Sequence, residues 1–313
     1  MPELGSAYLV EDTLGLRCFT FPMGVRTVRF FAMKDGPEQW TLIDCGLPGH
    51  VTSVLDEGQL PGRITRVILT HADADHIGGV AELLARFPNC EVCCHPLDCV
   101  WCANHDLLVR ERYGCARKQY GFGYLIEIQD AFRAACGDDF QISCLLNAGD
   151  TLAIGGVVWR VLHLPGHSLG HIGLYSSTDG VLLGGDAVLG DGPPDASGAP
   201  SMPPTHQFIR DYLSTLCLLE ALPIQHALFA HWPAMNAEAL REFIQTSRRV
   251  VARHLAWLVN RLNAPASFEE LLEELNARES CWAESENAHF QYALVGYLDY
   301  LREHGIQCDL KSI

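Results

Sequence analysis

The chain has 313 residues, of which 48% are apolar, enough for one large domain or for one domain with a smaller companion. Asp and Glu outnumber Lys and Arg by 38 to 22, and the net charge of -16 disfavours nucleic acids and anionic membranes as partners, because both bind clustered basic side chains. Thirteen cysteines cannot all pair within one chain, and residues 1–5 do not begin a signal peptide, so we expect a cytoplasmic protein with reduced thiols.

Strand-like runs alternate with helical segments over much of the chain. Apolar and β-branched runs of strand length lie at residues 25–33, 40–43, 66–69, 91–95, 151–164, 173–176, 181–183 and 227–230. A turn at 34–37 makes the first two runs a predicted hairpin. The run at 66–69 ends abruptly in the polar segment 70–76, and a predicted helix follows through Phe87. Polar residues at the carboxyl edge of a strand are where α/β proteins place their chemistry.

Helical patterns dominate two parts of the chain. The first is an insertion at about residues 97–148, between predicted strands. The second begins after Asn236, where the composition changes from mixed strand and helix to helix alone. We therefore predict a larger domain over residues 1–235 and a small helical domain over residues 236–313.

Residues 71–76 form the segment H-A-D-A-D-H, which concentrates two imidazoles and two carboxylates directly after a predicted buried strand. Packing does not require such a density of polar groups on one loop. Imidazole and carboxylate together suit zinc, iron or manganese, and four such groups can serve two adjacent ions. The alternative interpretation is a solvated polar turn.

Three later segments each place a potential ligand at the end of a predicted strand. They are His167 in L-P-G-H, Asp186 in L-G-G-D and His231 in F-A-H. Glycines beside His167 and Asp186 permit sharp turns that aim a side chain outward. Together with residues 71–76, this ordered set resembles the metallo-β-lactamase superfamily, whose hallmark is H-x-H-x-D-H, then P-G-H, then G-D and a final His. The resemblance covers residues from about 17 to 235.

The resemblance implies an α/β fold, the αββα metallo-β-lactamase sandwich, here with a helical insertion and a small helical C-terminal domain. It also implies two divalent metal ions, with zinc expected first and iron or manganese as alternatives. The implied ligands are His71, Asp73 and His167 for the first ion, Asp75, His76 and His231 for the second, and Asp186 between the two. Asp44 and His171 are implied to support these ligands from behind, Asp44 by orienting a ligand imidazole.

Asp73 departs from the family pattern, which usually has a second histidine at this position. A carboxylate can still ligate, and its extra negative charge favours harder ions such as iron or manganese. The iron-binding flavodiiron relatives carry a similar substitution, with Glu in place of Asp. Because Asp is shorter than Glu, Asp73 can instead reach the ion through water, which would leave one site weaker.

The resemblance implies a dinuclear hydrolase that cleaves an ester, thioester or lactone, as a thioesterase or lactonase does. Two cations about 3.5 to 4 Å apart can share a water and lower its pKa towards 7, and the bridging hydroxide is the expected nucleophile. The ions would also stabilise the oxyanion, and Asp75, the catalytic candidate, can orient the nucleophile. Alternatives are a di-iron redox protein, indicated by Asp73, and a metal-dependent phosphodiesterase, because the same pair of ions serves phosphoryl transfer.

The insertion contains a basic, aromatic island within an acidic chain. Its residues include Arg110, Arg112, Arg117 and Tyr120. In related hydrolases, segments at this point lie over the metal cleft, so we expect Arg110, Arg117 and Tyr120 to select a small anionic or aromatic substrate. The alternative is an ordinary helix with exposed arginines over an aromatic core. His206, after a Pro-rich loop, is a further candidate for contacting substrate.

The C-terminal region resembles the winged-helix-like tail of hydroxyacylglutathione hydrolase-like members of the superfamily. Ser267 and Glu270 spell a capping box, Gly305 is a predicted C-cap, and residues 306–310 are predicted to form a last short strand. Residues 236–313 carry 8 basic side chains against 12 acidic ones, which argues against reading DNA. Packing on the larger domain, forming part of the cleft wall, or making a homodimer are the remaining uses.

Overall fold

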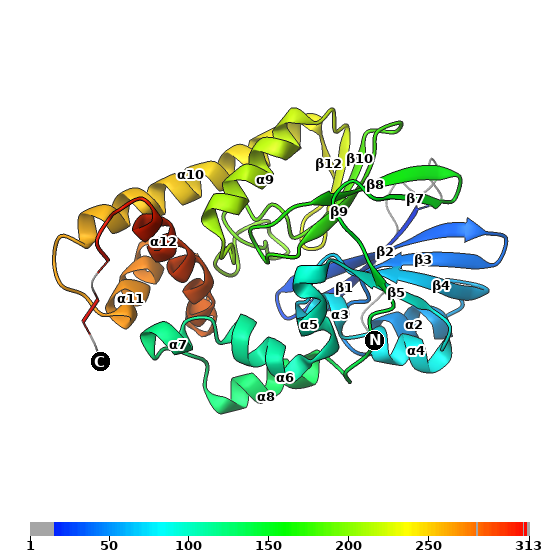
Figure 1. Ribbon diagram of the computed structural model, residues 1–313, viewed down its shortest axis with the longest axis horizontal. Helices are drawn as coiled ribbons and strands as arrows, with labels where there is room; N and C mark the ends of the chain where they lie inside the picture. Colours follow the sequence, from blue (N-terminus) through cyan, green and yellow to red (C-terminus); the bar gives the residue numbers. More distant parts are fainter. Residues whose placement is uncertain (1–15, 280, 309, 312–313) are drawn as a thin grey trace.

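The computed structural model describes residues 16–279, 281–308 and 310–311. Residues 1–5, on which the prediction about a signal peptide rests, lie outside this described part, as does the start of the predicted larger domain. Within it, two sheets pack face to face and helices cover both outer sides (Figure 1). The predicted αββα sandwich is therefore confirmed.

The first sheet has six described strands in the order of the chain. They are β1 (Leu16–Met23), β2 (Arg26–Gly36), β3 (Gln39–Ile43), β4 (Arg63–Ile68), β5 (Glu91–Cys94) and β6 (Cys144–Leu145). The strands β1 to β3 are antiparallel, which confirms the predicted hairpin, and β3 to β6 run parallel. Parallel strands bring the carboxyl ends of β3 and β4 to the same edge of the sheet.

The second sheet also has six described strands, in the order β12-β11-β10-β9-β8-β7. They are β7 (Thr151–Ile154), β8 (Val157–His163), β9 (Ile172–Ser176), β10 (Val181–Gly185), β11 (His226–Phe229) and β12 (Met235–Asn236). β10 and β11 are parallel to each other, and the other neighbours are antiparallel. The short strand β12 spans the predicted domain boundary at residues 235 and 236, and that boundary stays a prediction.

Three apolar clusters hold the layers together. The cluster between the sheets joins Phe31 and Ile68 of the first sheet to Trp159 and Leu183 of the second. The other two lie between each sheet and its outer helices. Because both faces of the central strands are buried, their sequences are apolar runs and do not alternate with polar residues.

The outer helices follow the strands that they cover. Beside the first sheet lie α2 (His50–Asp56), α3 (Ala74–Ile77) and α4 (Val80–Arg86), and beside the second lies α9 (Ile209–Ala221). The helix predicted from Gly78 and Gly79 through Phe87 is α4, and the short helix α3 before it was not predicted. The bend between them lies at Gly78 and Gly79, where an added Cβ would meet backbone oxygens at 2.5 Å and 2.7 Å.

The insertion is mainly helical, as predicted. It contains α5 (Pro96–Ala103), α6 (His105–Leu108), the π-helical turn η1 (Val109–Tyr113), α7 (Arg117–Tyr120) and α8 (Ile126–Ala135). Its last residues add the short strand β6 to the first sheet, which the sequence did not predict. α7 lies beside the C-terminal helices (Figure 1), where Tyr120 stacks on Phe268 with ring centroids 4.4 Å apart.

The C-terminal region is helical, with α10 (Ala237–Arg261), α11 (Phe268–Glu279), the 3-10 turn η2 (Glu284–Phe290) and α12 (Gln291–Glu303). The capping box is confirmed, because the Ser267 amide donates to Glu270 at 2.8 Å and the Glu270 amide donates to the Ser267 hydroxyl at 3.1 Å. Gly305 has a φ of 77°, as a C-cap glycine should.

The strand predicted at 306–310 is wrong for residues 306–308 and 310, which are irregular. The Ile306 amide closes the end of α12 on the Leu301 carbonyl at 3.0 Å, and the Ile306 and Leu310 side chains pack on the helical core. Their apolar character therefore reflects burial against helices. A winged-helix likeness of this region stays a prediction.

None of the thirteen cysteines, all within the described part of the chain, is in a disulfide, in line with reduced thiols. Among the described helices, none combines the length and apolar character that a membrane span requires.

Gly296 provides a test of how α12 packs. A Cβ at this position would lie 2.1 Å from the Gln207 carbonyl oxygen, in the segment that precedes α9. We expect Gly296→Ala to destabilise the protein by about 1–3 kcal/mol through overpacking. Gly123→Ala is the matched control, since its added Cβ would meet Arg117 at an ordinary 3.7 Å, and we expect it to stay within about 0.5 kcal/mol of the parent. Urea unfolding measures both, and equal stabilities of the two variants would contradict the predicted contact.

Candidate metal centre

The candidate ligands lie where strands of the two sheets end. Residues 71–76 follow β4, His167 follows β8, Asp186 follows β10 and His231 follows β11. Asp44 follows β3, next to β4 in the first sheet. The fold thus brings together side chains that are up to 160 residues apart in the sequence.

The first ligand set consists of His71, Asp73 and His167. The Nε2 atoms of His71 and His167 are 3.2 Å apart. The Oδ2 atom of Asp73 lies 2.8 Å from His167 Nε2 and 3.6 Å from His71 Nε2. Two ligand atoms that bind one ion at about 2.0–2.2 Å cannot be more than about 4.4 Å apart, and this set meets that limit.

The second ligand set consists of Asp75, His76, Asp186 and His231. His231 Nε2 lies 3.2 Å from Asp75 Oδ2 and 3.3 Å from Asp186 Oδ2. His76 Nε2 lies 3.8 Å from Asp186 Oδ2 and 4.0 Å from Asp75 Oδ1. Asp186 also groups with His71 and His167, so its carboxylate lies between the two sets.

The second set has the donor atoms that a metal ion needs. His76 Nε2 and Asp186 Oδ1 are buried and lack a hydrogen-bond partner among the described residues. The other ring nitrogen of His76 bonds Asp44 Oδ2 at 2.8 Å, and that of His231 lies 2.8 Å from the Thr27 carbonyl oxygen. Both imidazoles therefore turn Nε2 inward, the orientation that metal-binding histidines adopt. Burying such donors without a partner is costly, and a divalent cation would satisfy them.

Asp44 supports this arrangement from behind. Its carboxylate accepts hydrogen bonds from the Thr70 amide and the Thr70 hydroxyl, both at 2.8 Å, as well as contacting His76. Asp44 has a φ of 62°, a left-handed conformation that non-glycine residues rarely adopt. The strained turn after β3 thus aims the carboxylate under the loop that carries residues 71–76.

The carboxylates also set the protonation of the histidines in the second set. Burial lowers the pKa of His76, but Asp44, Asp75 and Asp186 outweigh it and raise the pKa to about 9. Burial likewise lowers the pKa of His231, and Asp186 and Asp75 raise it well above its usual range. Both shifts report a strongly negative potential, which favours a cation at this position.

Arg112 holds Asp73 in the first set. Its Nε and Nη2 atoms donate to the two carboxylate oxygens, each at 3.2 Å, and Nη2 also lies 3.2 Å from His167 Nε2. Burial raises the pKa of the Asp73 carboxyl, but Arg112 and His167 outweigh it and hold this pKa well below its usual range. The sequence places Arg112 in the basic island but predicts no role for it, because its partner Asp73 lies 39 residues away and a local pattern does not reveal such a pair.

A cleft of about 300 Å³ opens onto both ligand sets. Asp73, Asp75, His167, Asp186 and His231 form its floor. Its walls come from Met23, Arg26, Leu47, Tyr113, Phe132, Met202, His289 and Tyr292, among others. The wall residues of η2 and α12 show that the C-terminal region contributes to the cleft, one of the uses expected for it.

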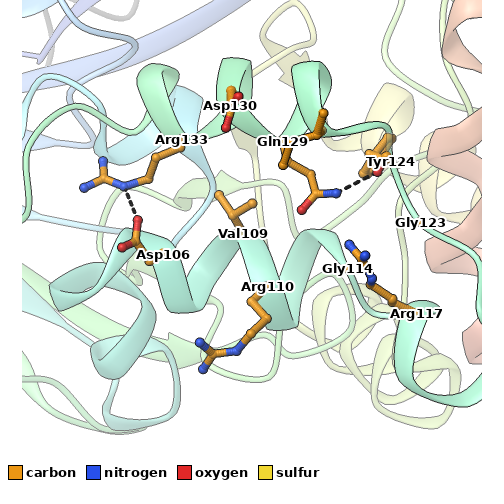
Figure 2. Close-up of a pocket in the computed structure, with 11 residues that line it drawn as sticks. Asp106, Val109, Arg110, Gly114, Arg117, Gly123, Tyr124, Gln129, Asp130 and Arg133 are labelled. Carbon is orange, nitrogen blue, oxygen red and sulfur yellow. Dashed lines mark hydrogen bonds and ion pairs between the residues drawn. The ribbon is translucent and has the colours of Figure 1, made fainter.

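The substrate candidates of the insertion lie elsewhere. Arg110 and Arg117 line a separate pocket of about 520 Å³ between η1 and α8, shown in Figure 2, together with Tyr124 and Arg133. Tyr120 stacks on Phe268 and its hydroxyl accepts a hydrogen bond from Arg302 at 2.7 Å. The structure does not place these three candidates on the metal cleft, so their proposed contact with substrate has no support from geometry.

The two remaining histidine candidates are buried. His171 accepts a hydrogen bond at Nε2 from the Asp186 amide at 2.9 Å, and so fixes the backbone behind that carboxylate. His206 bonds the Tyr297 hydroxyl at 2.6 Å and stacks on Tyr212. His171 therefore contacts the backbone of a candidate ligand, and its supporting role stays a prediction, whereas His206 packs inside the core between α9 and α12.

Comparisons with known proteins agree with this geometry. The model of the metallo-beta-lactamase superfamily matches residues 25–231. A probable metallo-hydrolase of Bacillus subtilis strain 168 is 27% identical over 170 residues, or 53% of this chain and 61% of the relative. A hydroxyacylglutathione hydrolase of Hamiltonella defensa is 30% identical over 161 residues, or 51% of this chain and 47% of the relative. The alignments thus span about half the length of these curated relatives.

Two solved structures share the fold over nearly the whole chain. A metallo-beta-lactamase family protein from Thermus thermophilus has a TM-score of 0.68 at 22% identity, covering 93% of this chain and 94% of its own. A beta-lactamase domain protein from Burkholderia ambifaria has a TM-score of 0.71 at 22% identity, covering 97% and 90%. The likeness extends to the C-terminal helices as well as to the sandwich.

Asp44→Asn tests the support of His76. Asn tolerates the left-handed backbone conformation but loses the charge that orients the imidazole. We expect the affinity of the second set for zinc to fall about 10–100-fold, as measured by competition with a chelator. Asp56→Asn, at an exposed position of helix α2, is the control and should bind zinc like the parent. Equal affinity of Asp44→Asn and the parent would show that Asp44 does not act through His76.

His206 predicts how stability depends on pH. Burial, with nearby His254 and His167, lowers the pKa of His206 to about 3. In the unfolded chain this imidazole takes up a proton near its ordinary pKa of about 6.5, so its contribution is complete above that pH and is lost as pH falls towards the folded pKa. From His206 alone the free energy of unfolding should fall by about 1.4 kcal/mol per pH unit between about pH 6 and pH 4.

Urea unfolding across this pH range compares His206→Gln with the control His226→Gln, at an exposed position of β11. The first variant should lose stability less steeply than the parent on acidification, because it has no proton to take up at this position. The control should follow the parent. A parent-like slope for His206→Gln would contradict the assignment.

Proposed function

Because the chain belongs to the metallo-β-lactamase superfamily, we propose that it is a metal-dependent hydrolase that cleaves an ester, thioester or lactone of a small substrate. The observation that carries the proposal is the second ligand set. Its buried His76 Nε2 and Asp186 Oδ1 atoms lack a hydrogen-bond partner among the described residues, and its Asp75, Asp186 and His231 line an open cleft. Two imidazoles and two carboxylates support zinc in this set, with iron and manganese as alternatives.

A divalent ion held there would supply an activated water and an electrophile for a carbonyl oxygen. The chain itself contributes orientation and charge. Asp75 faces the cleft and can accept a proton or a hydrogen bond from the attacking water, the role proposed for it as the catalytic residue. Asp44 and the Thr27 carbonyl hold the imidazoles of His76 and His231 in place, so that the site does not reorganise during the reaction.

The wall of the cleft supports a substrate with an apolar or aromatic part. Tyr113, Phe132 and Tyr292 offer rings, and Met23 and Met202 offer adaptable apolar surface. Arg26 is a basic wall residue, but its Nη1 atom already pairs with Glu286 at 3.0 Å. We therefore favour an aromatic or apolar group over a strongly anionic one.

The names of the curated relatives favour a thioester among the three bonds, since hydroxyacylglutathione hydrolases recur among them. We further propose a cytoplasmic enzyme that acts on small molecules, with neither nucleic acid nor membrane as partner, and that is able to form a homodimer. The net charge of -16 supports the exclusion of nucleic acid.

The two alternatives predicted from sequence have less support. The di-iron redox hypothesis rests on Asp73, whose two oxygens both pair with Arg112. The phosphodiesterase hypothesis needs a basic cleft, and the arginines of the insertion line a different pocket. Both stay open to the experiment below.

A panel of aryl and acyl esters, thioesters and lactones, assayed with zinc-loaded protein, tests the proposal. Asp186→Asn should lower kcat/KM by about 100-fold or more, because it weakens the ligand that lies between the two sets. Asp138→Asn, at an exposed position after α8, should retain the activity of the parent. An aryl phosphodiester and oxygen uptake with a reductant complete the panel, and absence of turnover for every ester, thioester and lactone would sink the proposal.

A further inference from the structure

The two ligand sets differ in what surrounds their donor atoms. In the first set, both oxygens of Asp73 and the Nε2 atom of His167 already lie within hydrogen-bond distance of the Arg112 guanidinium. In the second set, His76 Nε2 and Asp186 Oδ1 have no hydrogen-bond partner in the described part of the chain. Among the described residues, no arginine or lysine pairs with Asp75 or Asp186.

Arg112 is built into the first set. Its side chain is 1% exposed, Nη1 donates to Gln207 Oε1 at 2.8 Å, and the guanidinium lies over the Tyr292 ring at 5.1 Å. Contacts on each of these sides leave no exit to solvent. An arginine does not lose its proton in proteins, so this position carries a permanent positive charge.

That charge opposes a divalent ion in the first set. The guanidinium touches Asp73 and His167, two of the side chains that would bind the ion, so two cations would face each other across one ligand shell. The bidentate pair also occupies one lone pair on each oxygen of Asp73, which makes these oxygens weaker ligands for an ion. A histidine at position 73 could not accept such a bidentate pair, so Arg112 matches the departure from the family pattern at this position.

We propose that the Arg112 guanidinium is the resident cation of the first ligand set, so that the chain retains one divalent ion, held by Asp75, His76, Asp186 and His231. This inference deepens the metal site of the proposed function but does not depend on which bond the protein cleaves. It replaces the dinuclear centre expected from the resemblance with a centre of one metal and one arginine.

Zinc titration of the apoprotein, followed by elemental analysis after gel filtration, tests the proposal. The parent should retain one zinc per chain and bind a second at least about 100-fold more weakly. Arg112→Met removes the charge while keeping a long side chain, and it should tighten the weaker constant by at least about tenfold. Arg110→Met is the control, because Arg110 is 68% exposed and contacts neither set, and it should titrate like the parent.

Two outcomes would overturn the proposal. One is a parent that binds two zinc ions with constants within about tenfold of each other, and the other is a folded Arg112→Met protein whose weaker constant is unchanged. If Arg112→Met does not fold, parent crystals grown with one equivalent of zinc decide by anomalous scattering. A single peak among Asp75, His76, Asp186 and His231 supports the proposal, and a peak among His71, Asp73 and His167 overturns it.

None of these measurements reads turnover. A protein that retains one zinc but hydrolyses no ester, thioester or lactone would leave this inference intact and remove the proposed function. A protein that hydrolyses an ester, thioester or lactone and binds two ions equally tightly would support the proposed function and overturn this inference.

Discussion

Buried negative charge is the constraint on which this structure depends. Asp44, Asp73, Asp75 and Asp186 meet at the carboxyl ends of strands from both sheets, with little access to water. Carboxylates in such a place must be protonated or neutralised by cations, and the carboxyl groups of Asp73 and Asp186 have a pKa well below the usual range. The histidines, Arg112 and the expected metal ion are the groups that can neutralise these carboxylates.

The outer segments of the fold serve the same requirement. The π-helical turn η1 places Arg112 and Tyr113 side by side, one holding Asp73 and the other accepting a hydrogen bond from the Ala74 amide at 2.8 Å. Such turns often occur at functional sites. Gln207, in the segment before α9, and Tyr292 of α12 complete the surroundings of the guanidinium. The charge balance of the loop at residues 71–76 therefore depends on parts of the chain on both sides of the sandwich.

The fold and the clustering of the candidate ligands could be predicted from the sequence because their signals are local. Residues 71–76, His167, Asp186 and His231 each follow an apolar run, and the glycines mark the turns. The capping box at Ser267 and Glu270 is equally local. Arg112 could not be assigned in this way, because its meaning comes from a contact across 39 residues and from a π-helical turn. The strand predicted at residues 306–310 is wrong for a related reason. An apolar run alone does not distinguish a strand from an irregular segment that is buried against helices.

The change of composition near residue 236 does not mark the end of the candidate site, because residues on both sides of it contribute to the cleft. β12 spans that position and completes the second sheet, while His289 and Tyr292, far beyond it, line the cleft. Tyr292 lies under the Arg112 guanidinium, so the C-terminal helices help to keep a permanent cation beside the first ligand set. A site built only from the strand ends would have the donor atoms for two ions. It is the insertion and the C-terminal helices, packed together through Tyr120 and Phe268, that make the two ligand sets unequal.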